Sequence, residues 1–481
     1  MPGHDIDMRE VARRVVRDNG FTIELPDELA ASIPAEDPRA HARDLRRLAW
    51  SSIDNAESRD LDQVEVAEAL PDGTLRLWIG IADVDALVPR GSPIDRHAAL
   101  NTTTLYTGVE TFPMLPEVLS TGRTSLLEAQ DRLAVVTEVV VGPDGVLDDA
   151  QTQVYVARVT NHAKLVYERV GAWLEGNGPP PADPRIAAQL RLQDEAAERL
   201  RRRRHEHGAL ELETVEARPV TVDGRVVDLV LTHKNRARSL IEDLMIAANG
   251  ATARYLEARG IASIRRVVRA PRRWDRIQEL ARAVGTTLPA TPDSRALADF
   301  LAAQRIAEPA RFADLSLSIV KLLGPGAYQV QRPGDPDQGH FGLAVDDYAH
   351  STAPNRRYAD LVTQRLLKAA AESSASAPYS DDELVAIAAH CTEREDAARK
   401  VERTMRKVAA ASLLSSRIGD EFDAVVTGAA AKGTFVRLLS PPAEGRVVSG
   451  ERGLDVGDHV RVRLVATEPS RGFIDFQVAS S

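Results

Sequence analysis

The chain has 481 residues, with 71 acidic and 61 basic side chains and a formal net charge of −10 at pH 7. This length exceeds what one hydrophobic core usually organises, so we expect more than one domain. No segment approaches the roughly 18 uninterrupted apolar residues of a membrane span, the N-terminus resembles no signal peptide, and the single cysteine, Cys391, excludes an intramolecular disulfide. We therefore expect a soluble, cytoplasmic monomer with no membrane partner.

Residues 1–50 predict a small helical domain of the helix-turn-helix type. Apolar residues recur there at helical spacing and the pattern stops at Asn19-Gly20; they are Met8, Val11, Ala12, Val15 and Val16. Glycine after the last periodic residue is typical of a helix end.

From residue 51 the pattern changes to strands. The segments "VEVAEAL" (64–70) and "TLRLWIGIADV" (74–84) flank the turn Pro71-Asp72-Gly73, which predicts a hairpin. Closing it brings the segment around Asp83 beside Asp60 and Asp62. A second hairpin is expected around residues 142–145.

Long helical patterns follow at 186–205, 238–258 and 356–373. From about residue 417 the sequence pattern again predicts short strands separated by glycine residues. Five strands in about 65 residues suit an OB-fold barrel. The predicted fold class is α+β, with a mixed α/β catalytic domain over 51–412 between the N-terminal helices and a C-terminal OB-fold barrel over 417–481.

The segment "SIDNAESRDLDQVEV" (52–66) gathers the acidic residues Asp54, Asp60 and Asp62 before a strand. Carboxylates this close repel one another unless solvent screens them or a cation binds, and their hard oxygen atoms suit magnesium. The pattern alone fits a metal site and an exposed turn equally well. The acidic net charge argues against a nucleic-acid partner, whereas arginine clusters at 199–205, 263–274 and 355–361 argue for one.

The surrounding segments resemble the ribonuclease II and R family, whose catalytic domain is called RNB. "SIDNAESRDLDQV" is similar to the family's acidic signature, and further segments follow in the family's order over residues 51 to 410: "IADV" (81–84), "FPMLPEVLS" (112–120), "AKLVYERV" (163–170), "GALELET" (208–214), "SLIEDLMIAAN" (239–249) and "GLAVDDYAHSTAPNRRYADL" (342–361). The resemblance implies a processive, hydrolytic 3′→5′ exoribonuclease that degrades single-stranded RNA to nucleoside 5′-monophosphates, with Mg²⁺ or Mn²⁺ as cofactor.

The resemblance also assigns roles to individual residues. Asp54, Asp60, Asp62 and Gln63 occupy the metal-binding positions, Asp62 being catalytic. Arg356 occupies the position of the catalytic arginine that grips a phosphate of the RNA near its 3′ end.

Three further positions are assigned to RNA binding. Tyr106 and Tyr167 fall where the family stacks aromatic rings on the last bases, and Glu242 where a glutamate contacts the 3′-terminal sugar and so separates RNA from DNA.

The sequence departs from the family pattern in three places. Gln63 is neutral where the signature has a fourth acid, Leu212 stands where a second aromatic is expected, and only about 50 residues precede the catalytic domain instead of two cold-shock barrels. With fewer domains around the entrance for RNA, we expect the protein to digest a duplex that carries a 3′ single-stranded overhang.

Two other functions fit parts of the pattern. Gln63 could leave a catalytically silent or weakly active RNA-binding member of the family. The third hypothesis is a phosphoesterase that acts on small nucleotides. The C-terminal barrel argues against it, because a small substrate does not need an additional RNA-binding domain.

Overall fold

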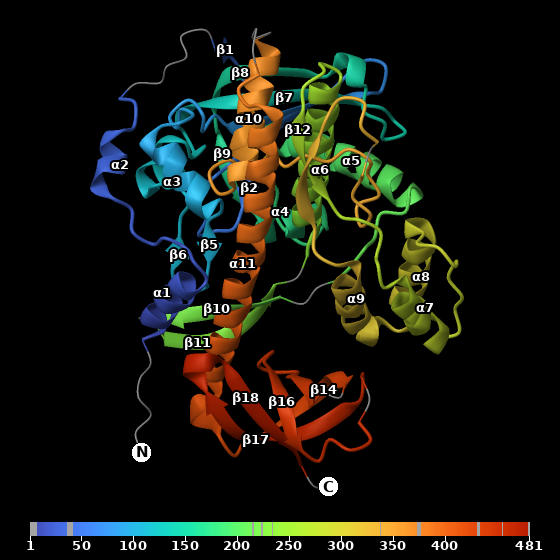
Figure 1. Cartoon of the computed structure of the whole chain (residues 1–481). Helices are drawn as coiled ribbons and strands as arrows, with labels where there is room; N and C mark the ends of the chain where they lie inside the picture. The colour runs from blue at the N-terminus through green and yellow to red at the C-terminus, as the bar shows by residue number, and fades with distance from the viewer. Residues whose placement is uncertain are drawn as a thin grey trace.

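The computed structural model of the chain describes residues 7–35, 42–213, 216–222, 225–232, 234–336, 338–372, 377–430, 433–454 and 456–479 (Figure 1). A mixed α/β body forms the upper part of the molecule, and a β-barrel lies below it. This arrangement confirms the predicted α+β class with a C-terminal barrel.

The body is built on a seven-stranded sheet with the order β1-β8-β7-β4-β3-β2-β9. Its strands are β1 (Arg43–Asp44), β2 (Ser51–Asp54), β3 (Gln63–Ala69), β4 (Leu75–Ala82), β7 (Asp131–Val141), β8 (Gln153–Thr160) and β9 (Ala163–Val166). Strands β3 and β4, and β7 and β8, pair antiparallel, which confirms both predicted hairpins. Gln63 pairs with Ile81, and the Ala82 amide donates to the Asp62 carbonyl at 2.9 Å. The segment around Asp83 therefore lies beside Asp62, as predicted.

Helices cover both faces of this sheet. Residues of β3 alternate between two cores: Val64 and Val66 join the cluster that includes α3 and α10, whereas Ala67 joins the cluster that includes α5 and α6. The helices on these faces are α3 (Pro93–Asn101), α4 (Tyr167–Leu174), α5 (Pro184–Glu206), α6 (Arg236–Glu257), α10 (Tyr358–Ala371) and α11 (Asp381–Leu414). Of these, α5, α6 and α10 confirm the three helices expected from periodicity.

Smaller elements surround the body. A separate apolar cluster joins three helices, α7 (Trp274–Ala283), α8 (Ser294–Ala307) and α9 (Pro309–Leu323). Three two-stranded sheets pair β5 (Leu105–Tyr106) with β6 (Thr111–Phe112), β10 (Glu216–Val222) with β11 (Arg225–Thr232), and β12 (Ser263–Val267) with β13 (Ala327–Gln331). Short helical turns occur at η1 (Leu119–Arg123), η2 (Asp149–Gln151), η3 (Ser415–Arg417) and η4 (Pro469–Arg471). No helix in the described ranges is both long enough and apolar enough to cross a membrane.

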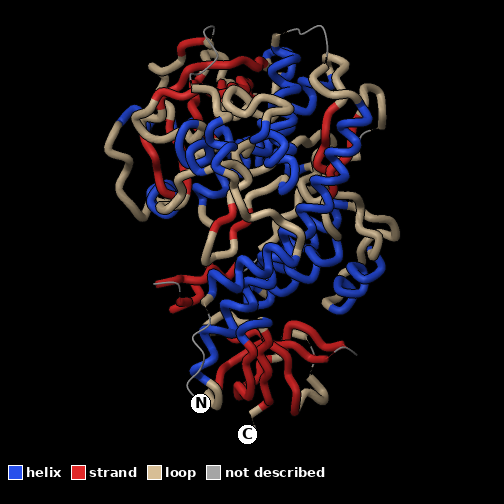
Figure 2. Tube along the Cα trace, turned by 60° about the vertical axis from the view of Figure 1, so that its left-hand side comes forward, coloured by secondary structure: helices blue, strands red, loops and turns tan. Residues whose placement is uncertain are grey.

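The barrel is closed by five strands in the order β14-β15-β16-β18-β17. They are β14 (Glu421–Ala430), β15 (Gly433–Leu438), β16 (Glu444–Ser449), β17 (His459–Glu468) and β18 (Phe473–Val478), which confirms the five-stranded prediction. The 34-residue helix α11 runs from the body down to the barrel (Figure 2). Arg437 of β15 also pairs with Asp314 of α9 at 2.8 Å, so the barrel contacts α9 as well as α11.

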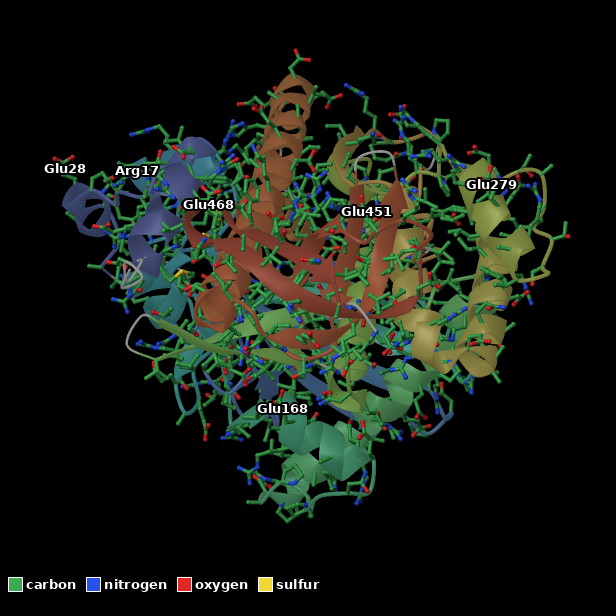
Figure 3. The ribbon with its side chains drawn as sticks, turned by 90° about the horizontal axis from the view of Figure 1, so that it is seen from below. Arg17, Glu28, Glu168, Glu279, Glu451 and Glu468 are labelled. Carbon is green, nitrogen blue, oxygen red and sulfur yellow. The ribbon has the colours of Figure 1, made fainter. Side chains whose placement is uncertain are left out.

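The described part of residues 1–50 contains α1 (Met8–Asp18), α2 (Asp27–Ala31) and β1. Asp7 caps α1 by accepting from the Arg9 amide at 2.8 Å, and the apolar face of α1 joins one cluster with α11 and the barrel. Seen from below, α1 with Arg17 and α7 with Glu279 lie on opposite sides of the barrel, which carries Glu451 and Glu468 (Figure 3).

Candidate active site

The acidic segment is a loop between β2 and β3 that the body holds in place. The Lys164 ammonium donates to the carbonyls of Ala56 and Ser58 at 2.9 and 2.5 Å. At the end of the loop, the Ser125 hydroxyl accepts from the Leu61 amide at 2.9 Å. These bonds fix the loop from both sides, so the positions of its carboxylates are set by the sheet.

Asp62 is the most buried carboxylate of the predicted site. Its side chain is 2% exposed, its Oδ1 accepts from the Asn355 amide at 3.2 Å, and its Oδ2 accepts from Arg356 Nε at 3.1 Å. Burial raises the pKa of Asp62 to about 6, although the Arg356 charge opposes the shift. The Arg356 side chain is itself 46% exposed. Arg356 therefore contacts the buried acid while the rest of its guanidinium stays open to a ligand.

Tyr106 lies against the same acids. Its hydroxyl donates to Asp60 Oδ2 at 2.8 Å, and the residue is 42% exposed. Burial of the phenol oxygen raises its pKa, and the neighbouring Asp60 raises it further. The structure thus brings four predicted site residues together, namely Asp60, Asp62, Tyr106 and Arg356.

Asp54 lies at the end of β2 in a second group. Its Oδ1 accepts from the Ser58 hydroxyl at 2.7 Å. The pKa of the Tyr167 phenol is raised by burial and then by the charges of Asp54 and Glu65, whereas Arg238 and Arg356 oppose the shift. The charges of both the Asp54 group and the Arg356 group therefore act on the Tyr167 phenol.

Arg238 and Glu65 complete the Asp54 group. Arg238 lies over the Tyr167 ring, with its guanidinium carbon 4.3 Å from the ring centroid, and donates to Asn55 Oδ1 at 2.8 Å. Glu65 of β3 is fully buried, and neither of its carboxylate oxygens has a hydrogen-bond partner. Burial raises the pKa of Glu65 well above its usual value, and the charge of Asp54 adds to the shift.

Gln63 is buried on β3, two residues before Glu65. Within the described ranges, no three histidine, cysteine or acidic side chains form a ready-made metal cluster. In this protein, the acids contact Ser58, Tyr106 and Arg356 instead. Their chemistry still fits a hard divalent cation, because all are oxygen donors and Glu65 adds two buried oxygens without partners.

Glu242 lies apart from the aspartates, in a cavity of about 690 Å³ between α5, α6 and α9. Its side chain is 45% exposed and forms an ion pair with Lys234. Leu212, the residue that departs from the family's aromatic, lines the same cavity, whereas Asp54, Asp60 and Asp62 do not. The structure thus separates the predicted sugar contact from the acidic group.

Sequence reasoning missed four groups near this site: the side chains of Glu65, Arg238 and Lys164 and the backbone amide of Asn355. For Glu65 a signal existed, because residues two apart in a strand share a face and Glu65 follows Gln63 at that spacing. Lys164 and Asn355 lie in segments that carry the family resemblance, 163–170 and 342–361, but no local pattern indicates that they contact the acidic loop. Arg238 comes from a segment far away along the chain.

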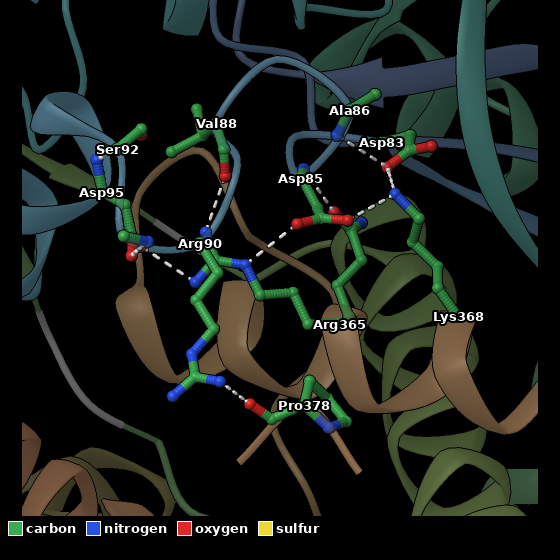
Figure 4. A network of polar contacts seen from close by, with 12 residues as sticks. Asp83, Asp85, Ala86, Val88, Arg90, Ser92, Asp95, Arg365, Lys368 and Pro378 are labelled. Carbon is green, nitrogen blue, oxygen red and sulfur yellow. Dashed lines mark hydrogen bonds and ion pairs between the residues drawn. The ribbon is translucent and has the colours of Figure 1, made fainter. Parts of the chain in front are cut away.

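Another set of acidic residues, Asp83, Asp85 and Asp95, lies next to the site and is paired with basic side chains (Figure 4). Lys368 of α10 contacts Asp83 at 2.7 Å and Asp85 at 2.6 Å. Arg365 contacts Asp85 at 2.9 Å and Asp95 at 2.8 Å. This network ties the segment after β4 to α3 and α10.

Comparisons with known proteins agree with this geometry. A family model described as "RNB domain" matches residues 42–373, and one described as "RNase II-type exonuclease C-terminal S1 domain" matches residues 420–479. The chain is 30% identical to "Ribonuclease R" of Escherichia coli K12 over 93% of this chain and 58% of that protein. It is 32% identical to "Exoribonuclease 2" of Escherichia fergusonii over 82% of this chain and 61% of that protein. The chain spans about three fifths of the length of these relatives.

Solved structures share the fold. Mycoplasma genitalium RNase R in complex with double-stranded RNA matches with a TM-score of 0.86 and 25% identity, covering 99% of this chain and 84% of that chain. Yeast Ssd1, described as a pseudonuclease, matches with a TM-score of 0.71 and 17% identity, covering 95% of this chain and 58% of that one. The fold therefore occurs both in a ribonuclease and in a protein described as a pseudonuclease.

Proposed function

Since the chain belongs to the RNB-domain family, which includes ribonuclease R and exoribonuclease 2, we propose that it is a metal-dependent exoribonuclease. It hydrolyses single-stranded RNA processively from the 3′ end and releases nucleoside 5′-monophosphates. One observation carries the proposal: Arg356 contacts the buried Asp62 at 3.1 Å while 46% of its side chain remains exposed. Such an arginine is anchored on the protein and open to a phosphate at the same time.

Asp54, Asp60 and Asp62, together with Gln63, would hold Mg²⁺ or Mn²⁺, because these cations prefer oxygen ligands. When bound, the metal supplies positive charge to the scissile phosphate and lowers the pKa of a water molecule. Asp60 and Asp62 would offer a cation the oxygen lone pairs that their contacts with Tyr106 and Arg356 leave unused. Arg356 would stay anchored on Asp62 and donate to the phosphate from its exposed side.

The chain's own residues position the RNA. Arg356 can donate a forked pair of hydrogen bonds to phosphate oxygens and stabilise the charge that develops during hydrolysis. The exposed ring of Tyr106 and the partly buried ring of Tyr167 offer stacking surfaces for bases, worth about 1–3 kcal/mol each. Glu242, in its open cavity, can accept a hydrogen bond from a 2′-hydroxyl, which favours RNA over DNA.

The test uses a 5′-labelled single-stranded RNA of about 30 nucleotides with Mg²⁺ or Mn²⁺. We expect a labelled end product of a few nucleotides without a ladder of intermediates, and nucleoside 5′-monophosphates from uniformly labelled RNA. DNA of the same sequence and the Asp62→Asn variant are the controls. Intact RNA at every metal concentration would overturn the proposed activity.

A catalytically silent RNA-binding protein is the second candidate. Gln63 and Leu212 favour it, since each removes a group that the family pattern includes, and the fold is shared with a protein described as a pseudonuclease. The same reaction separates the two functions. A silent protein retards labelled RNA in a binding gel and leaves its length unchanged.

We also propose that the chain digests a duplex that carries a 3′ overhang. The solved relative in complex with double-stranded RNA shares this fold. A labelled duplex with 3′ tails of different lengths tests the idea. Passage of digestion through the junction supports it, whereas arrest several nucleotides before the junction at every tail length contradicts it.

A further inference from the structure

The N-terminal segment, residues 7–25, packs against the hairpin of β5 and β6 that carries Tyr106 (Figure 1). Leu105 of β5 and Phe112 of β6 are buried in the same apolar cluster as α1, α11 and the barrel. Neighbouring residues of a strand point to opposite faces, so burial of Leu105 turns Tyr106 to the other face. On that face the Tyr106 hydroxyl contacts Asp60.

Asn101 joins the N-terminal segment to the base of the hairpin. The residue is 6% exposed, and its side chain makes two hydrogen bonds to the backbone of Thr22. The Thr22 amide donates to Asn101 Oδ1 at 3.0 Å, and Asn101 Nδ2 donates to the Thr22 carbonyl at 2.7 Å. Because both groups belong to one residue, the pair fixes the position of Asn101 relative to the segment.

The residue after Asn101 has a strained backbone. Thr102 is buried and has a positive φ of 58°, which is a rare and costly conformation for a β-branched residue. Such strain persists only where neighbouring contacts fix the backbone. Asn101 provides one anchor through Thr22, and the Tyr358 amide provides another by donating to the Thr102 carbonyl at 2.8 Å. The N-terminal segment therefore helps to hold the turn from which the chain enters β5.

The tip of the hairpin contacts the same segment. Arg13 of α1 donates two hydrogen bonds to Glu110, from Nε at 3.1 Å and from Nη2 at 2.7 Å. Glu110 also closes the hairpin turn, because its carbonyl accepts from the Thr107 hydroxyl at 2.6 Å. The N-terminal segment thus contacts the hairpin on both sides of Tyr106 along the chain.

We propose that the N-terminal segment is a platform that positions the Tyr106 ring for stacking on RNA, with Asn101 and the Arg13–Glu110 pair as its positioning residues. The proposal rests on the proposed function, in which Tyr106 stacks on a base. A ring that is held in its binding position loses less conformational freedom when RNA binds, so the contacts that hold it add to affinity.

The other explanation is that the segment only covers α11 and the barrel, and that the bond to Asp60 alone holds Tyr106. A double-mutant cycle separates the two explanations, because residues that act through one another are not additive. The measurement is the affinity of the full chain for a 5′-fluorescent single-stranded RNA of about six nucleotides. Anisotropy in a chelator gives this affinity without hydrolysis.

We expect Asn101→Ala to weaken binding about fivefold, which is part of the loss that Tyr106→Ala causes. In the Tyr106→Ala background, Asn101→Ala should cause no further loss. Asn19→Ala is the matched control, because Asn19 lies in the same segment and donates to the Val15 carbonyl at 2.8 Å within it. It should bind RNA like the unaltered chain. Circular dichroism and thermal melting check that the variants are folded.

A charge exchange tests the platform at its exposed end. The Arg13 side chain is 54% exposed, so its replacement does not disturb a core. Arg13→Glu places two acids together and should weaken binding about twofold. The double variant Arg13→Glu/Glu110→Arg restores the pair and should recover the original affinity. If Asn101→Ala fails to fold, this exchange decides the question.

Unaltered affinity in folded Asn101→Ala, or losses that multiply in the double variant with Tyr106→Ala, would overturn the platform and leave the proposed function standing. The absence of rescue by Glu110→Arg would likewise count against it. If the unaltered chain binds the RNA but hydrolyses none with Mg²⁺ or Mn²⁺, the proposed activity fails and the binding cycle still decides the role of the platform. A chain that binds no RNA would overturn both.

Discussion

Two aspartate pairs with the same spacing lie side by side in this protein and have different partners. Asp60 and Asp62 precede β3, and Asp83 and Asp85 follow its partner strand β4. The Ala82 amide donates to the Asp62 carbonyl, so the two pairs meet at one end of the hairpin. Asp83 and Asp85 share the ammonium of Lys368, whose side chain is only 4% exposed. Asp62 contacts Arg356, whose side chain is 46% exposed, and Asp60 contacts the neutral phenol of Tyr106.

The difference separates an acid pair that is enclosed by structural contacts from one that is open to a ligand. The Asp83–Asp85 pair is closed, because a buried cation contacts both carboxylates and no part of that cation is left for a ligand. The Asp60–Asp62 pair is open, because its two partners each present a large exposed surface. An acid pair whose partners are exposed is accessible to a cation and a phosphate.

Asp62→Asn breaks the open pair and has the largest expected effect. We expect RNA hydrolysis to fall about a thousandfold or more, since metal-assisted charge stabilisation is worth several kcal/mol. RNA binding should change little, because the stacking residues and Arg356 remain. Single-turnover kinetics and a filter-binding assay measure the two properties separately. Near-normal turnover by the purified variant would remove Asp62 from the mechanism.

Lys368→Met breaks the closed pair and should act on stability instead. Removing a buried cation leaves Asp83 and Asp85 without it, and breaking such a pair typically costs about 3–5 kcal/mol. The free energy of unfolding from urea denaturation is the measurement. Lys400→Met, at an exposed position of α11, is the control and should change it by less than about 0.5 kcal/mol. A loss of hydrolysis in folded Lys368→Met at unchanged stability would contradict the structural role of this pair.

The sequence predicts the fold of this region better than it distinguishes the pairs. Alternating apolar residues and the Pro71-Asp72-Gly73 turn were sufficient for the hairpin, and helical periodicity was sufficient for α5, α6 and α10. Both aspartate pairs, however, read as Asp-x-Asp, and the cations that distinguish them lie nearly 300 residues away along the chain. Family resemblance singled out the Asp60–Asp62 pair, whereas the local pattern could not choose between the two pairs.

Family resemblance also gave no indication that Glu65 is unusual. A site inferred from a family signature contains only the positions that the signature names, so an acid outside it is read as an ordinary strand residue. Burial and the absence of hydrogen-bond partners are three-dimensional properties. They arise because α4, α5 and α6 pack over that face of the sheet, and the sequence alone does not show this packing.

The two pairs also predict opposite responses to pH in the metal-free protein. The folded-state pKa of Asp62 is raised to about 6, so its contribution to stability is present below its ordinary pKa and is lost as the pH rises through about 6. Burial opposes ionisation of Asp85, but Lys368 and Arg365 outweigh it and lower its pKa, so its contribution is present near neutrality and is lost as the pH falls through the lowered value.

Urea denaturation in a chelator at pH 4 and pH 7.5 measures these contributions. Relative to the unaltered chain, Asp62→Asn should gain up to about 3 kcal/mol between the two pH values, because it cannot ionise. Asp85→Asn should lose stability at pH 7.5 and less at pH 4. Parallel pH profiles for the two variants would mean that both pairs are equally closed.

Tyr106 tests the open pair with the smallest expected effect, because it separates the contact with the acid from the contact with RNA. Its hydroxyl donates to Asp60, and its exposed ring is free to stack on a base. Tyr106→Phe removes the first interaction, and Tyr106→Ala removes both.

Stacking is worth about 1–3 kcal/mol and matters most when few nucleotides remain bound. We therefore expect Tyr106→Ala to release longer end products from 5′-labelled RNA on a denaturing gel, whereas Tyr106→Phe gives end products of the original length. If Tyr106→Phe lengthens the products as much as Tyr106→Ala, the bond to Asp60 is the important contact. If neither variant alters them, Tyr106 does not contact the RNA, and the open pair faces its ligand through Arg356 alone.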